Sequence, residues 1–429
     1  MITTLLDGVA PLVTAADAVL KTDQTVTVSI GVDHVGRLER YDGVRCHLRV
    51  LKDDRIGMAG ATDYRWQRLR QAAIDSAEVG TLAPLFLPSP AATPEVHTAD
   101  RVALSAGPMQ LLDLARSVVR RLEEDRWRVE VWAERSAGRV EVANTRGVVA
   151  GYDQTLVGVG VTVFDSSNPT PVPLSLQTVG SSWPTGLDVE ALVAAVTQWL
   201  SPPPLDRLPN PDPVRICLGP RAVRALLRPL ELGLLGESVF DGSSPFRDRV
   251  GDVVVPEVLT IVDDPTISLR PASRPVDDDG VVSRRLALID RGRFTGWVSD
   301  LASGARLGIP STGHARRQSH APPRVAYSNL IVGSGEVPTA EFLTEGEAIL
   351  VEDLPIPTGN VIDGRVTLVT PWAYWMSEGE RVGRFRSATI SGNVFDLLQH
   401  IVAVGREQQW IGSWCGPSIL VDGVDLRVR

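Results

Sequence analysis

Valine and charged residues alternate in RVEVWAERSAGRVEVANT, residues 128–145, the clearest strand pattern of the chain. A period of two is typical of a β-strand with one buried face. The small residues Ser136, Ala137 and Gly138 interrupt the run and predict a turn between two strands. A third strand is predicted within TLVGVGVTVF, residues 155–164.

Amphipathic helices are predicted on both sides of these strands. One begins near Pro108, and another, over residues 187–200, places its apolar residues on one face. Upstream, TVTVSIGVDHVGRLERY (25–41) and GVRCHLRVLKDDRIGMAG (43–60) predict further strands, and Thr62 is the predicted cap of a third helix. Strands bracketed by helices predict an α+β fold whose N-terminal layer combines antiparallel strands with helices.

Proline-rich residues 201–213, SPPPLDRLPNPDP, predict a stiff, extended linker, because proline interrupts helices and central strands. We therefore expect an N-terminal domain over residues 1–200, with a weaker break near 80–100, and a C-terminal domain over 214–429. The second half contains short strands and Gly/Pro turns, with one helix near 221–227 ended by Pro229 and another at 394–404. This pattern predicts a β-rich C-terminal domain with a curved-sheet or barrel-like body.

Composition limits the class of protein. The chain has 429 residues, 43% of them hydrophobic, and a formal charge of −9. The acidic balance weighs against nucleic acid as a partner, and no apolar run is long enough to cross a membrane. Asp7 within the first apolar run is atypical of a secretory signal, and three cysteines without a CxxC pair favour a reducing compartment. We therefore expect a cytoplasmic protein.

Motifs for hydrolytic chemistry are sparse. A zinc-peptidase helix needs two histidines one turn apart and a glutamate that activates water, but neither HExxH nor HExxxH occurs. His314, His320 and Cys415 could together form a His/His/Cys metal site. We favour instead a His314 that hydrogen-bonds within a turn and a Cys415 that is a small buried hydrophobic residue, because spacing alone is weak evidence for a metal site.

Each charged cluster allows more than one interpretation. Residues 263–264 and 277–279 are aspartates that could bind a divalent cation. Turn formation is favoured, because aspartate before proline or glycine hydrogen-bonds to nearby backbone amides. Arg316, Arg317 and Arg324 could clamp a carboxylate or phosphate. They could also form a solvated edge or an interface patch, and the interface patch is favoured beside the neighbouring prolines.

A series of short motifs follows in order along the chain. They are DGVR (42–45), DRIG (54–57), NTRG (144–147), DGSSPFRDRVGD (241–252), LTIVDDP (259–265), DDDG (277–280), LIDRGR (288–293), STGHAR (311–316), Asn329, SGN (391–393) and GPSI (416–419). Over residues 27–423 this order resembles the TldD/PmbA family. The shared order makes the resemblance specific, although each motif alone is weak.

The resemblance implies a role for the chain. The family has two kinds of subunit, which are understood to pair as a heteromeric zinc metallopeptidase. The TldD kind carries HExxxH on the helix that corresponds here to RAVRALLRPLEL, residues 221–232, which contains no histidine. The chain therefore resembles the TldE/PmbA kind, which lacks the zinc site. This implies no catalytic residue and no metal in this chain, and zinc in a TldD-type partner.

The resemblance also implies partners and a region for substrate. We expect a TldD-type subunit as partner, a peptide or peptide-like substrate, and a homodimer when the chain is alone. The candidates for a substrate cavity or an interface are Thr312, Gly313, His314, Arg316 and Asn329. Trp297, Trp372, Trp375 and Trp410 could anchor an interface, although each alone is favoured as core. Two alternatives stay open: an amide-cleaving pair in natural-product maturation, and a gyrase-modulator role without hydrolysis.

Overall fold

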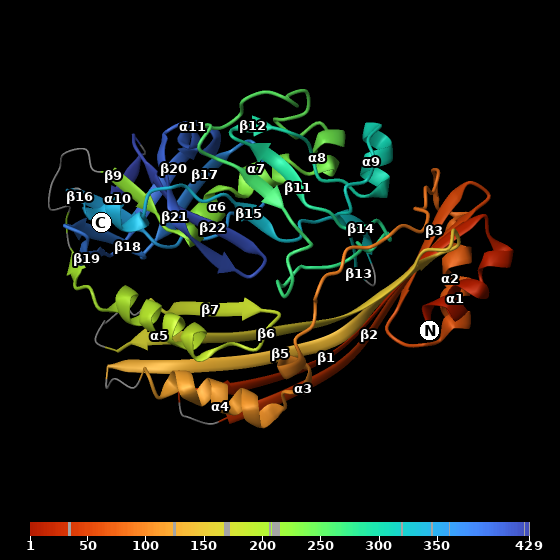
Figure 1. Cartoon of the computed structure of the whole chain (residues 1–429), viewed down its shortest axis with the longest axis horizontal. Helices are drawn as coiled ribbons and strands as arrows, with labels where there is room; N and C mark the ends of the chain where they lie inside the picture. The colour runs from red at the N-terminus through yellow and green to blue at the C-terminus, as the bar shows by residue number, and fades with distance from the viewer. Residues whose placement is uncertain are drawn as a thin grey trace.

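Two large sheets form the computed structural model (Figure 1), which describes all residues except 33–35, 123–125, 167–171, 206, 208–214, 319–320, 345, 360, 424 and 429. The first sheet is antiparallel, with seven strands in the order β4-β3-β2-β1-β5-β6-β7. Its strands are β1 Ala15–Ile30, β2 Gly36–Lys52, β3 Arg55–Ala61, β4 Thr81–Leu82, β5 Trp127–Asn144, β6 Val149–Asp165 and β7 Leu174–Gly180. Figure 1 shows this sheet as a long, curved ribbon.

The predicted turn at residues 136–138 is wrong, because β5 runs through it without a break. Ser136 pairs with Thr25 on β1, and Gly138 pairs with Asp23. A Cβ atom added to Gly138 would lie 1.8 Å from the carbonyl oxygen of Thr22. The close approach of two backbones therefore requires glycine here, and glycine in a strand pattern signals either a turn or such an approach.

Helices α4 Pro108–Val119 and α5 Gly186–Leu200 confirm the two predicted helices and cover one face of the first sheet (Figure 1). α4 packs on β1 and β5, while α5 packs on β7. Helix α2 Trp66–Glu78 also forms, but its N-cap is Arg65 and no side chain caps it, so the predicted Thr62 cap is wrong. The other helices of this half are α1 Ile2–Asp7, a 3-10 turn Ala10–Leu12, and α3 Arg101–Ser105.

The faces of β1 follow the period of two expected for a strand. Ala16, Ala18 and Leu20 pack in the apolar cluster formed with α1 and α2. Asp17 and Lys21 therefore share the opposite face, which is turned toward the second half of the chain. This alternation places charged residues of the first sheet at the junction between the two sheets.

The second sheet has eleven strands and is open. Its order is β12-β11-β10-β15-β22-β9-β16-β18-β19-β8, with β21 paired to β22. Its strands are β8 Pro204–Leu205, β9 Arg215–Leu218, β10 Ile261–Asp263, β11 Leu286–Asp290, β12 Arg293–Phe294, β15 Leu330–Val332, β16 Glu347–Val351, β18 Ala373–Ser377, β19 Glu380–Phe385, β21 Ile401–Ile411 and β22 Trp414–Val421. Within the described residues β12 and β8 do not pair, so the curved sheet, and not the barrel, is observed. The predicted α+β class is confirmed.

Smaller elements complete this half. A hairpin joins β13 Ala315–Gln318 and β14 Ala321–Val325, and a three-stranded sheet contains β17 Arg365–Thr370, β20 Ala388–Asn393 and β23 Leu426–Val428. The helices are α6 Pro220–Leu226, α7 Arg228–Gly233, α8 Gly236–Phe240, α9 Leu301–Leu307, α10 Thr339–Thr344 and α11 Val394–Leu398. None of the described helices has the length and apolarity of a membrane span.

Three local predictions in this half need correction. Pro229 does not end helical structure but lies in the first turn of α7, where proline is tolerated because its missing N–H would have no partner. The helix predicted over 394–404 stops at Leu398, and Ile401 begins β21. Within the proline-rich segment, Pro204–Leu205 pair with β19 as a parallel strand. Residues 206 and 208–214 lie outside the described part, so the domain boundary at 201–213 stays a prediction.

Candidate functional site

His314 is fully buried, and both nitrogens of its ring are engaged. Because a carboxylate only accepts, Nε2–H donates to Asp263 Oδ2 at 2.9 Å. Nδ1 lies 2.8 Å from the Thr312 hydroxyl, which is the donor when the ring is neutral. The contact with Thr312, two residues away, agrees with the local hydrogen bond that we favoured from the sequence, but the bond to Asp263, 51 residues away, was not predicted. Neither nitrogen offers a free lone pair.

Asp263, the partner of His314, is a satisfied buried carboxylate. The backbone N–H of Ser328 donates to Oδ1 at 2.8 Å, and the Ser328 hydroxyl donates to Oδ2. Burial by itself would raise the pKa of Asp263, but the hydrogen bonds from His314 and Ser328 bring that pKa below its ordinary value. Ser328 donates to the aspartate and not to the histidine, so these residues do not form a nucleophile–base pair.

Gly313 and Asn329, two other candidates from the sequence, stabilise the local backbone conformation. Asn329 Nδ2 donates to the carbonyl of Asp264 and to the Ser273 hydroxyl, both at 2.9 Å, and all of this group is buried. Gly313 has φ +81°, a conformation that favours glycine, and its carbonyl accepts a hydrogen bond from Arg274. Gly313 therefore shapes the segment that carries Thr312, His314 and Arg316, whereas Asn329 joins Asp264 to Ser273.

Some aspartates of the two clusters form turns, as predicted, and others do not. Asp264 Oδ1 accepts from the N–H of Thr266 at 2.8 Å, and Asp277 Oδ1 accepts from the N–H groups of Asp279 and Val281. The remaining aspartates of the second cluster form ion pairs with residues far away in the sequence, which local spacing did not predict. Lys21 Nζ donates to Asp278 Oδ2 at 2.5 Å across the junction between the sheets.

Asp17, Arg49, Asp279 and Arg317 form a buried ion-pair network at the same junction. Arg317 donates to both oxygens of Asp17, at 2.9 and 2.7 Å, and also to Asp279. Arg49 donates to Asp17 at 3.2 and 2.5 Å and to Asp279 at 3.0 Å. The interface patch predicted from Arg317 is therefore wrong, because this guanidinium pairs inside the chain. The one sequence signal for Asp17 was a charge within the otherwise apolar run AADAVL.

Arg316 and Arg324, the other two arginines of that cluster, face each other on the β13–β14 hairpin. Arg316 is half-buried, and neither guanidinium has a hydrogen-bond or ion-pair partner in the part of the chain that the structure describes. Of the tryptophans, Trp372 and Trp375 lie in the core, whereas Trp297 and Trp410 are half-buried and Trp410 stacks under Arg270.

Residues 221–232, where the resemblance implies a zinc helix in the other kind of subunit, form α6 and most of α7. Arg228 Nη1 donates to Glu231 Oε2 at 3.3 Å, and the Tyr327 hydroxyl donates to the Glu231 carbonyl at 2.6 Å. Burial raises the pKa of the Glu231 carboxyl. This segment offers one carboxylate and no imidazole.

The described side chains do not fit a zinc centre. Cys415 is a free, buried thiol on β22, and burial raises its pKa to about 11, which disfavours the thiolate that metals need. His314 has no free nitrogen, and His320 lies outside the described residues. Among the residues that can be described, no three His, Cys, Asp or Glu side chains are grouped to hold a metal ion.

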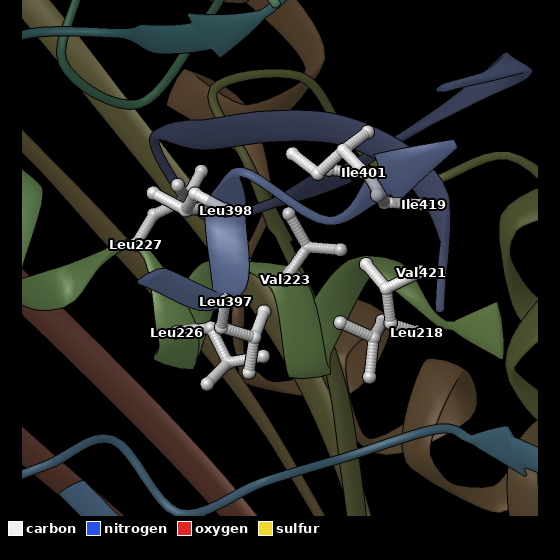
Figure 2. Close-up of a pocket in the computed structure, with 9 residues that line it drawn as sticks. All are labelled: Leu218, Val223, Leu226, Leu227, Leu397, Leu398, Ile401, Ile419 and Val421. Atoms are coloured by element: carbon white, nitrogen blue, oxygen red, sulfur yellow. The ribbon is translucent and has the colours of Figure 1, made fainter. Parts of the chain in front are cut away.

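A small apolar cavity of about 10 Å³ lies elsewhere, between α6, α11, β9 and β22 (Figure 2). The nine side chains labelled in Figure 2 are all aliphatic, and they converge without any polar group. A space of this size without hydrogen-bond partners cannot hold an ordered water. It is a packing defect of the core and not a substrate site.

Comparison with known proteins places the chain in a family. A family model described as the PmbA/TldA metallopeptidase C-terminal domain matches residues 211–427, just over half of the chain. The chain is 27% identical over 180 residues to a metalloprotease TldD homolog of Haemophilus influenzae, and 29% identical over 179 residues to metalloprotease PmbA of Escherichia coli O157:H7. Each match covers 41% of this chain but 37% of the relative, so the chain spans little more than a third of these curated relatives.

A solved structure shares the fold over the whole length. TldE from Thermococcus kodakarensis superposes with a TM-score of 0.88 and covers 99% of both chains, at 21% identity. At that identity the likeness extends to the fold alone. The match to the family model over half of the chain is what identifies it: the chain belongs to the TldD/PmbA metallopeptidase family.

Proposed function

We propose that this chain is the TldE/PmbA-type subunit, without a zinc centre, of a heteromeric metallopeptidase that cleaves amide bonds in peptides or peptide-like compounds. The observation that carries the proposal is the segment at residues 221–232. There α6 and α7 present Arg228 and Glu231, bonded to each other, where a metal site would need histidines. A TldD-type partner would supply the metal.

The contribution of this chain would be geometric. The segment from Thr312 to Arg316 is held rigidly, because His314 and Arg317 on either side of Arg316 are anchored by buried hydrogen bonds. A rigid wall can complete a cavity, exclude bulk water and limit access to extended or short peptides. We place this function in the cytoplasm, and Cys46, Cys217 and Cys415, all free and buried, support a reducing compartment.

Metal analysis tests the first half of the proposal. The purified chain should hold no stoichiometric zinc after overnight dialysis against zinc-free buffer. His400→Ala, which removes an exposed histidine, provides the control for His314→Ala. The proposal would be contradicted if one zinc per chain survived dialysis and was lost in His314→Ala but not in His400→Ala.

Reconstitution tests the second half. The chain alone should cleave no peptide, whereas a mixture with a TldD-type partner should, and a chelator should abolish that cleavage. Light scattering should show a complex with the partner, and a homodimer without it. Arg316→Ala should change the rate or substrate range of the pair, while the matched Arg324→Ala should not. Hydrolysis by this chain alone in the presence of chelator would contradict the scheme.

The same mixture separates the alternatives. Cleavage of one modified amide, with unfolded peptides left intact, would favour natural-product maturation. Binding to gyrase without hydrolysis by the pair would favour a gyrase-modulator role, which the formal charge of −9 limits to protein contacts more readily than to DNA.

A further inference from the structure

Arg274 is the least satisfied buried cation among the described residues. Its side chain has no solvent exposure. Nη2 donates to the carbonyl of Gly313 at 3.2 Å, but Nε and Nη1 have no hydrogen-bond partner in the part of the chain that is described. A buried guanidinium with free donors is strongly unfavourable, and such a group in a native protein calls for a ligand, an ion or a water.

The carboxylates nearest to Arg274 accept their hydrogen bonds from other residues, although Asp278 Oδ1 has no partner among the described residues. Asp277 accepts from the backbone N–H groups of three residues, Asp279, Val281 and Ala315. Asp278 accepts through Oδ2 from Lys21 Nζ at 2.5 Å and from the N–H of Arg317 at 2.7 Å. Neither aspartate forms an ion pair with Arg274 in this arrangement.

Arg274 and Arg316 differ from the other cations of the junction. Lys21, Arg49 and Arg317 each form an ion pair with an aspartate. Among the described residues neither Arg274 nor Arg316 forms such a pair, and Nε and Nη1 of Arg274 keep their donors free.

Arg316 is the strongest like-charge neighbour of Arg274, and it also lacks a partner among the described residues. Because Arg316 is half-buried, it connects the buried Arg274 with solvent. Tyr152 on β6 lines up with Val140 on β5 and Lys21 on β1, and it packs in one apolar cluster with Val276. Burial raises the pKa of Tyr152 to about 12, so its hydroxyl stays a donor at neutral pH.

We propose that Arg274 and Arg316 bind a small carboxylate at the junction of the β13–β14 hairpin with the first sheet. Guanidinium donors match the planar, charged oxygens of a carboxylate, and these two arginines have no carboxylate partner among the described residues. The site stands on the geometry of this chain alone and does not depend on the proposed peptidase function.

Titration of the full chain with sodium acetate at constant ionic strength tests the site. Acetate should bind one to one and raise the melting temperature, while acetamide, its neutral isostere, should do neither. Arg274→Gln should abolish binding, and Arg316→Gln should weaken it about tenfold or more, because each removes a charged hydrogen bond. Arg324→Gln, on the strand opposite Arg316, should bind acetate as the wild type does.

Further variants and ligands serve as controls for the acetate titration. If Arg274→Gln fails to fold by circular dichroism, Arg316→Gln carries the test alone. A tripeptide acid that binds while its C-terminal amide does not would show that a peptide terminus can be the source of the carboxylate. A wild type that ignores acetate, or variants that bind it unchanged, would overturn the proposal. So would a crystal structure in acetate with only a water between Arg274 and Asp278.

Discussion

His314 acts as a cross-link between segments far apart in the chain. It joins the segment before β13 to Asp263 at the end of β10, 51 residues away, and Ser328, just before β15, also binds Asp263. Each polar atom of the pair has a partner, so the cost of burying the carboxylate is offset by charge-assisted hydrogen bonds. At the scale of the residue, the contact of His314 with Asp263 therefore has a structural role and not a catalytic one.

Replacing His314 should therefore destabilise the protein. His314→Ala leaves Asp263 buried without its main partner, and we expect a loss of about 3 kcal/mol in the free energy of unfolding at pH 7. Urea denaturation followed by circular dichroism measures it. The exposed His400→Ala should change the free energy by less than about 0.5 kcal/mol.

A double variant separates this pair from general damage. Asp263→Asn combined with His314→Ala removes the buried charge together with its partner, so it should lose less than the sum of the two single variants. Strict additivity would show that the two side chains contribute independently.

At the scale of elements, α5 links the two sheets. One apolar cluster contains Val189, Val196 and Trp199 of α5 together with Leu350 of β16 and Tyr374 of β18. The Tyr374 hydroxyl donates to the carbonyl of Trp199 at 2.9 Å, and the ring of Trp372 lies 5.8 Å from that of Trp199. The helix packs on β7 and is buried against the second sheet at its C-terminal end.

The N-terminus of α5 is fixed by a capping box. Thr185 Oγ1 accepts from the N–H of Asp188 at 3.3 Å, and Asp188 Oδ2 accepts from the N–H of Thr185 at 2.7 Å. Thr185→Ala should cost about 1 kcal/mol of unfolding free energy. Thr197→Ala, in the exposed last turn of the same helix, should be neutral within about 0.5 kcal/mol. Equal losses in thermal or urea unfolding would argue against the cap.

At the scale of the whole molecule, the network of Asp17, Arg49, Asp279 and Arg317 ties the first sheet to the second half of the chain. Burial would raise the pKa of Asp17, but Arg317 and Arg49 overcome burial and hold that pKa well below its usual range. Folded protein therefore keeps Asp17 ionised at a pH where the unfolded chain binds a proton.

The sign of the pH dependence follows from that difference. The stability from Asp17 is fully present above the unfolded pKa of about 4 and is lost as the pH falls below it. Asp17→Asn should cost about 3 kcal/mol at pH 7, because two guanidiniums lose a buried partner. It should also flatten the loss of stability between about pH 5 and pH 3. Asp63→Asn, at an exposed ion pair, should leave that slope unchanged in unfolding curves across the range.

Periodicity and local chemistry determined much of this protein without the structure. The period of two predicted strands where β5 and β6 lie, although it divided β5 in two. Helical spacing predicted α4 and α5, and the mixture of both predicted the α+β class. Motif order indicated the family, and aspartates before proline and glycine indicated turns. These signals are local, since they depend on backbone preferences and on which face of one element is apolar.

Only the tertiary structure decided which charges meet. Arg49 and Asp279 are 230 residues apart, and Asp17 and Arg317 are 300 apart, yet each pair is in direct contact. It also decided that Gly138 lies inside a strand, because the need for glycine came from a neighbouring backbone. Strand pairing and the packing of one sheet on another set these contacts, and neither leaves a pattern within a short window of sequence.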